Sequence, residues 1–149
     1  MKTKVINILN LSFITISIII LLLTYNYIPN KLPTHYDFFG NPDAWGDKSS
    51  IWVIIIVVIV LNIILHIVGM FPQTWNIPIE LNDSNRSIVY ELLSNMLSVL
   101  RLEMTIMFIS FLYFEITLLR LPTVSLIFFL VLIFSTIVLY MVKIYKHKI

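Results

Sequence analysis

Long apolar runs alternate with short polar connections along this chain. Three runs, residues 5–24, 51–71 and 122–141, are each about as long as a helix that crosses the hydrocarbon core of a bilayer. A fourth run, residues 100–119, contains three charged residues but is uncharged through its middle. We therefore predict an all-α membrane protein with four transmembrane helices, and we expect residues 1–149 to form a single four-span domain.

The segment before the third span carries a helical pattern of its own. Within residues 84–100, apolar residues fall on one side at 3.6-residue spacing, and Ser or charged residues follow the opposite side. The apolar positions are Val89, Leu92, Leu93, Met96 and Leu100. This pattern predicts an inner amphipathic helix that lies at the interface or beneath the bundle and joins or turns into the third span.

Composition excludes several classes of protein. Hydrophobic residues make up 59% of the chain and charged residues 12%, about half the charged fraction of a soluble domain. The chain has no cysteine, so disulfides and thiolate metal sites are excluded. The net charge of +2 and its dispersed lysines argue against nucleic-acid binding. Membrane lipid is the expected surround, and self-association remains open.

Charge asymmetry predicts the orientation of the spans. With the N-terminus in the cytoplasm, inner segments hold seven Lys or Arg residues and outer segments hold three, in accord with the positive-inside rule. We expect a multi-pass protein of a bacterial cell membrane with both termini cytoplasmic. The first run could also be a cleavable signal peptide, but its length and the lack of a small-residue cleavage site favour a retained span.

Residues 28–50, between the first two spans, form an outer motif rich in ionisable, aromatic and turn-forming residues. Residues 41–44 read as a tight turn with Pro42 at its second position, and Gly40 beside it is free to take a positive φ. We expect an ordered outer loop that contacts a ligand or partner. The candidate residues are His35, Asp37, Gly40, Pro42, Asp43, Trp45, Lys48 and Glu115.

Glu115 is included because of its depth in the third span. It lies about 7 Å before the outer end of that span, where a cation of the outer motif can reach it. Lys48 is the expected partner, with Lys31 and His35 as alternatives. Such a pair is either a structural salt bridge that docks the loop or an anionic ligand for an outside partner.

Polar residues also lie inside the first two spans. Asn62 and His66 are four residues apart and share one helix face, and Asn10 lies at a depth similar to that of His66 if the two spans are antiparallel. We expect interhelical hydrogen bonds that hold the bundle together, with a ligand or proton role as the alternative.

The outer motif gives weak support to metal binding or catalysis. His35 and Asp37 are two residues apart, so in an extended strand they would share a face, as a common metal ion requires. The motif offers a single His, however, and a set of Ser49, His35 and Asp37 lacks the context of a nucleophile. We expect no metal, no cofactor and no enzymatic activity.

The outer motif resembles a known family. Leu32-Pro33-x-His35, Gly40-x-Pro42-Asp43-x-Trp45 and Lys48 are similar to a domain of unknown function, DUF1648, of small bacterial membrane proteins, which also forms the front part of the SdpI-type immunity proteins. Trp75-Asn76-Ile77-Pro78, with Asn85 and Tyr90, resembles the polar stretch after the second span, so the similarity covers most of Ile28 to Glu91. SdpI-type proteins carry further spans beyond this region.

The resemblance implies a role in resistance to a secreted toxic peptide and in holding a repressor at the membrane. Our leading hypothesis is an immunity or receptor type of membrane protein whose outer loop contacts a peptide toxin or an envelope partner. A second is an accessory or regulatory subunit packed against a transporter or membrane enzyme. A third is a transporter or membrane enzyme that uses His35, Asp43 and Glu115.

Overall fold

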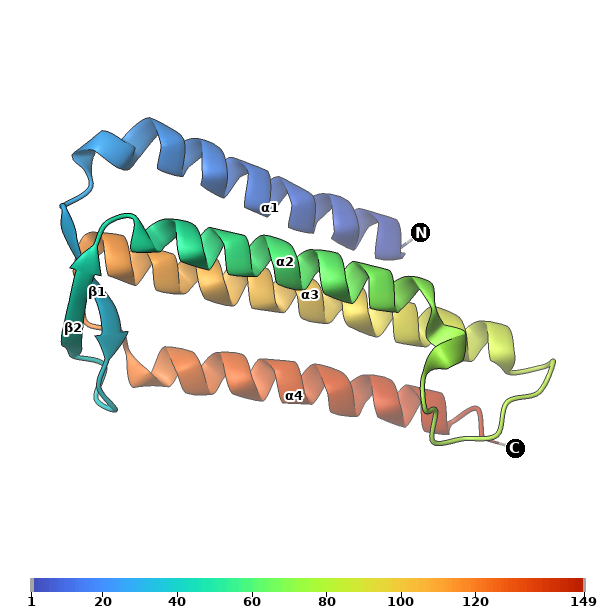
Figure 1. Cartoon of the computed structure of the whole chain (residues 1–149). Coiled ribbons are helices and arrows are strands. Elements are labelled where there is room, and N and C mark those ends of the chain that lie inside the picture. The colour runs from blue at the N-terminus through green and yellow to red at the C-terminus, as the bar shows by residue number, and fades with distance from the viewer. Residues whose placement is uncertain (1, 149) are drawn as a thin grey trace.

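The computed structural model describes residues 2–148, which form four long helices and one β-hairpin (Figure 1). All four helices are long and apolar enough to cross a membrane, so the four-span prediction is confirmed and the chain is a multi-pass membrane protein. The elements are α1 (Lys2–Thr24), η1 (Tyr25–Tyr27), β1 (Lys31–Tyr36), β2 (Pro42–Asp47), α2 (Ser50–Met70), η2 (Pro72–Thr74), α3 (Arg86–Thr117) and α4 (Thr123–Tyr145).

The central element of the bundle is α3. Helices α1, α2 and α4 each pack against it. The hairpin lies at one end of the bundle, and the first and last described residues lie toward the other end (Figure 1). We call these ends the hairpin end and the terminal end. Because four helices run between them, any site on the hairpin is separated from the chain termini by the length of a membrane span.

The predicted inner helix is the first half of α3 and is continuous with the third span. Arg86–Thr117 contains neither Gly nor Pro, so nothing in the sequence breaks its hydrogen-bond ladder. Its apolar stripe packs at the terminal end in a cluster made of Ile79, Val89, Leu93, Met96 and Ile144. With 32 residues, α3 is about 48 Å long, and it therefore exceeds the roughly 30 Å hydrocarbon core.

The predicted outer loop is an antiparallel hairpin. Lys31 pairs with Asp47, Pro33 with Trp45, and the register shifts on both sides of His35. These irregularities let the strands bend at His35. The sequence had indicated order in this segment but not strand pairing.

The predicted tight turn at residues 41–44 is wrong, because Pro42 instead begins β2. The chain reverses between Asp37 and Asn41, where the Gly40 N–H donates to the Asp37 carbonyl at 2.9 Å. The Asp37 carboxylate accepts hydrogen bonds from Asn41 N at 2.8 Å and Asn41 Nδ2 at 3.0 Å. These bonds hold the pKa of Asp37 below its usual value. Gly40 has the predicted positive φ, 80°.

Candidate functional site

The hairpin tip is fixed to the connection between α3 and α4. The carbonyls of Phe38, Phe39 and Gly40 accept hydrogen bonds from Thr123 Oγ1 at 3.0 Å, Arg120 Nε at 2.8 Å and Leu121 N at 2.9 Å, respectively. An ideal Cβ built on Gly40 would lie 1.6 Å from the Leu121 carbonyl oxygen. The close approach therefore requires glycine, for its missing side chain as well as for its positive φ.

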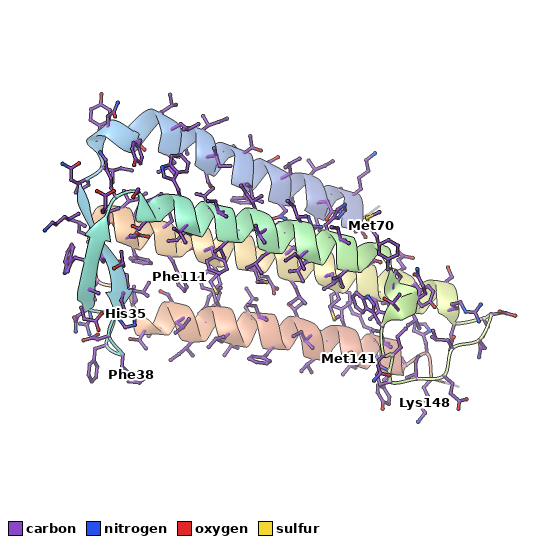
Figure 2. The ribbon with its side chains drawn as sticks, viewed as in Figure 1. His35, Phe38, Met70, Phe111, Met141 and Lys148 are labelled. Atoms are coloured by element: carbon purple, nitrogen blue, oxygen red, sulfur yellow. The ribbon has the colours of Figure 1, made fainter. Side chains whose placement is uncertain are left out.

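A cavity of about 670 Å³ lies between the hairpin and the first turns of α4. Figure 2 shows His35 and Phe38 on the hairpin beside the start of α4. The lining residues are His35, Tyr36, Asp37, Phe38, Gly40, Asp43, Leu121, Thr123, Leu126 and Ile127. Four of the eight residues predicted from the sequence, His35, Asp37, Gly40 and Asp43, thus line one cavity. Its opposite wall is formed by residues 121–127, which lie outside the outer motif.

His35 and Asp43, which both line this cavity, contact each other. His35 Nδ1 lies 2.6 Å from Asp43 Oδ1, a contact that is an ion pair when the imidazole is protonated. His35 and Asp37 do not act together as the shared face of an extended strand would allow, because the register shifts around His35 and Asp37 is engaged in the turn. Among residues 2–148, no group of three His, Cys, Asp or Glu residues is arranged to hold a metal ion.

Tyr36 is a cavity residue that the sequence analysis did not select. Its hydroxyl is buried and has no hydrogen-bond partner within the described part of the chain. Burial, and secondarily the Glu115 carboxyl, raises the pKa of Tyr36 above 10.0. At neutral pH Tyr36 therefore keeps its phenol proton. Its position between His35 and Asp37 is the sequence signal that could have selected it.

Pro42, Trp45 and Lys48 do not line the cavity. Pro42 begins β2, where a missing N–H is tolerated. The side chain of Trp45 is 53% exposed. Lys48 Nζ lies 4.8 Å from the centre of the Tyr25 ring, on the side of the hairpin that joins α1. These three residues therefore belong to the hairpin but do not contribute to the cavity.

The predicted pair of Glu115 with Lys48 is wrong. Glu115 is 4% exposed and its Oε1 accepts a hydrogen bond from Ser50 Oγ at 2.9 Å. Ser50 is the first residue of α2, which packs on α3, so a short side chain reaches the carboxyl directly. Lys48 precedes the helix and turns to Tyr25 instead. Glu115 therefore joins α2 to α3 just beneath the hairpin.

A second polar cluster lies inside the bundle, toward the terminal end. Asn10 Nδ2 donates to Asn62 Oδ1, and Asn62 Nδ2 donates to Thr105 Oγ1 at 2.9 Å. The predicted interhelical hydrogen bonds of Asn10 and Asn62 are confirmed. His66 also takes part, since its Nδ1 lies 3.0 Å from Arg101 Nη1. The cluster joins α1, α2 and α3.

One segment of the chain matches a known protein family. Residues 13–65 match the family model described as a domain of unknown function, DUF1648. This segment contains the second half of α1, the hairpin and most of α2, and it ends before the Trp75–Pro78 stretch and before the α3–α4 wall of the cavity.

An uncharacterized protein of the archaeon Archaeoglobus fulgidus is 29% identical over 80 residues, which is 47% of this chain and 44% of the relative. The match thus spans less than half the length of that relative. No solved structure matches the chain.

Proposed function

We propose that this protein is a membrane receptor or immunity protein whose hairpin binds a peptide toxin or another envelope component on the outer face. The observation that carries this proposal is the cavity between the hairpin and α4, in which charged, aromatic and apolar residues converge. The cavity brings together elements separated by about 80 residues, so it depends on the folded bundle and not on the motif alone.

The chemistry of the cavity fits a basic and partly apolar peptide segment. Asp37 and Asp43 provide carboxylates, His35 provides an imidazole, and Leu126 and Ile127 form an apolar floor. The three hydrogen bonds that fix the tip reduce the ordering cost of binding.

The outer surface of the hairpin adds aromatic area for contact. Phe38 is 82% exposed and Phe39 63% exposed, and their rings pack edge to face at 5.5 Å. Large aromatic side chains with few rotatable bonds are frequent anchors of protein interfaces. The same two residues supply the carbonyls that tether the tip, so the exposed rings stand on a fixed backbone.

This proposal requires the hairpin to face outward, and we predict that orientation from the charge distribution. The chain has no native cysteine, so Asn41→Cys and His147→Cys provide a clean pair. An impermeant thiol reagent should label Asn41→Cys in intact cells and His147→Cys only after permeabilisation. The reverse pattern would place the hairpin in the cytoplasm and exclude an extracellular ligand.

Photo-crosslinking tests the binding function. Replacing Phe38 with p-benzoylphenylalanine should yield a discrete adduct with a peptide or envelope protein in cells, and Asp43→Asn should reduce its yield about tenfold, as expected when a charge-assisted contact is lost. The same photo-reactive residue at Phe71, which is exposed at the terminal end, is the matched control. Absence of an adduct at position 38, or an equal yield with Asp43→Asn, would contradict the proposal.

A second candidate function is that of an accessory subunit in a larger membrane complex. The α4 helix offers a surface for such packing, because Phe128, Val131, Phe134, Val138 and Leu139 are all exposed in this chain. A photo-reactive residue at Phe134 distinguishes the two functions. Adducts with an integral membrane protein from Phe134, without adducts from Phe38, would favour the subunit role.

A further inference from the structure

Arg101 lies within the bundle and has no carboxylate partner among residues 2–148. Its Nη1 is 3.0 Å from His66 Nδ1 and 3.4 Å from Asn7 Oδ1, and its Nε is 3.4 Å from Asn62 Oδ1. The ion pairs among residues 2–148 are His35–Asp43 and Arg86–Asp83. The described part of the protein therefore solvates this guanidinium with amide and imidazole groups but does not neutralise its charge.

The guanidinium lies near the terminal end of the membrane span. His66 and Asn62 are four and eight residues before Met70, the last residue of α2, or about 6 Å and 12 Å along the helix. Met70 marks the terminal end in Figure 2. Because Nε contacts Asn62 and Nη1 contacts His66, the Arg101 side chain extends from the deeper level toward the interface, as a snorkelling arginine does. Its charge is thus held close to the level of lipid headgroups.

Two cavities meet at Arg101 and His66. The larger, about 360 Å³, lies between α1 and α2, and most of its walls are apolar. It is lined by Asn10, Leu11, Ile14, Thr15, Ile18, Ile59, Asn62, Ile63, His66 and Arg101. The smaller, about 80 Å³, has mixed walls, in which Thr3, Asn7, Ser94 and Ser98 stand beside Leu65, Met70 and Leu97. An apolar groove thus continues into a small cavity with several polar side chains, and the cation lies where the two join.

A buried acceptor in the same groove is also unmatched. Asn10 is 1% exposed, and its Oδ1 has no hydrogen-bond partner in the structure, while its Nδ2 is used by Asn62. A buried polar atom without a partner is costly. Within the described part of the chain, the groove therefore contains a cation without an anionic partner and a buried acceptor without a donor.

We propose that this groove binds an anionic glycerophospholipid. The lipid phosphate contacts Arg101 and His66, and one acyl chain lies along the isoleucines of α1 and α2. The surrounding bilayer supplies such a lipid directly to a groove that opens between two membrane helices. This site lies at the opposite end of the bundle from the hairpin cavity and does not depend on the function proposed above.

The test measures lipid binding to the full chain purified in detergent. Phosphatidylglycerol should raise the melting temperature and remain bound in native mass spectrometry, whereas phosphatidylcholine with the same acyl chains and inorganic phosphate should do neither. Arg101→Gln should weaken the apparent affinity for phosphatidylglycerol about fivefold or more. Arg86→Gln removes an exposed arginine that is paired with Asp83 at the first residue of α3 and should leave that affinity unchanged.

A second variant covers the case in which Arg101→Gln does not fold. Ile63 is 54% exposed and lines the groove, so Ile63→Trp should fill the acyl-chain path without removing any hydrogen bond of the cluster. It should weaken phosphatidylglycerol binding to a similar extent. Wild-type affinity in the folded variants, equal binding of phosphatidylcholine, or stabilisation by inorganic phosphate alone would each overturn the proposal.

Discussion

Substitution of Gly40 with alanine is expected to destabilise the protein by about 3–4 kcal/mol. The new Cβ would lie 1.6 Å from the Leu121 carbonyl oxygen and 2.8 Å from its carbon, and the backbone φ of 80° is strained for any residue with a side chain. The hairpin must move away from the α3–α4 connection, which breaks the three hydrogen bonds of the tip. Thermal unfolding in detergent measures the loss.

Gly69→Ala is the matched control for this substitution. An ideal Cβ at Gly69 would meet Leu97 Cδ1 at 3.5 Å, an ordinary contact, and the position is helical. Alanine there should be neutral or stabilising by up to about 1 kcal/mol. A Gly40→Ala variant as stable as Gly69→Ala would mean that the hairpin is not docked as described, and the hairpin cavity would lose its second wall.

Substitution of Asn62 with leucine is expected to cost about 2–4 kcal/mol. Asn62, on α2, is 8% exposed and hydrogen-bonds to Asn10 of α1 and to Thr105 and Arg101 of α3. Leucine would leave the side chain of Asn10 and the Nε of Arg101 without this partner inside the bundle. Unfolding in detergent compared with Asn26→Leu, an exposed position at the hairpin end, measures the specific loss.

A double-mutant cycle with Asn10→Leu separates this hydrogen bond from general packing. Once Asn62 is leucine, Asn10 has lost its partner, so removing it as well should cost less than it does in the wild-type protein. The double variant should therefore be more stable than the sum of the two single losses predicts. Strict additivity would show that the two amides do not interact in the folded protein.

The helices of this protein follow directly from its sequence because a bilayer imposes one length and one polarity on every span. The hairpin does not follow in the same way. Its strands, KLPTHY and PDAWGD, lack an alternating apolar pattern and contain Pro or Gly, so the strand signal is weak. The Asp37 carboxylate closes the turn, and residues 120–123 hold it in place.

The candidate site was predictable to the extent that it lies in one segment. His35, Asp37, Gly40 and Asp43 were selected from a dense local motif, but Leu121 and Thr123 carry no signal of their own. Glu115 shows the same limit. The rise of the helix places Glu115 just beneath the hairpin, as predicted. Its partner depends on how α2 and α3 are rotated against each other, and the observed rotation brings Ser50, and not Lys48, to the carboxyl.

The long-range tether of the hairpin has a consequence for biosynthesis. Arg120 and the Phe39 carbonyl that it contacts are separated by 81 positions in the chain. When the ribosome has produced the hairpin and α2, the three carbonyls at the tip have not yet met their donors, and only water can satisfy them. The candidate site is therefore completed late, when the start of α4 has emerged and been inserted. A nascent chain arrested before residue 120 would display the motif at the membrane without the cavity between the hairpin and α4.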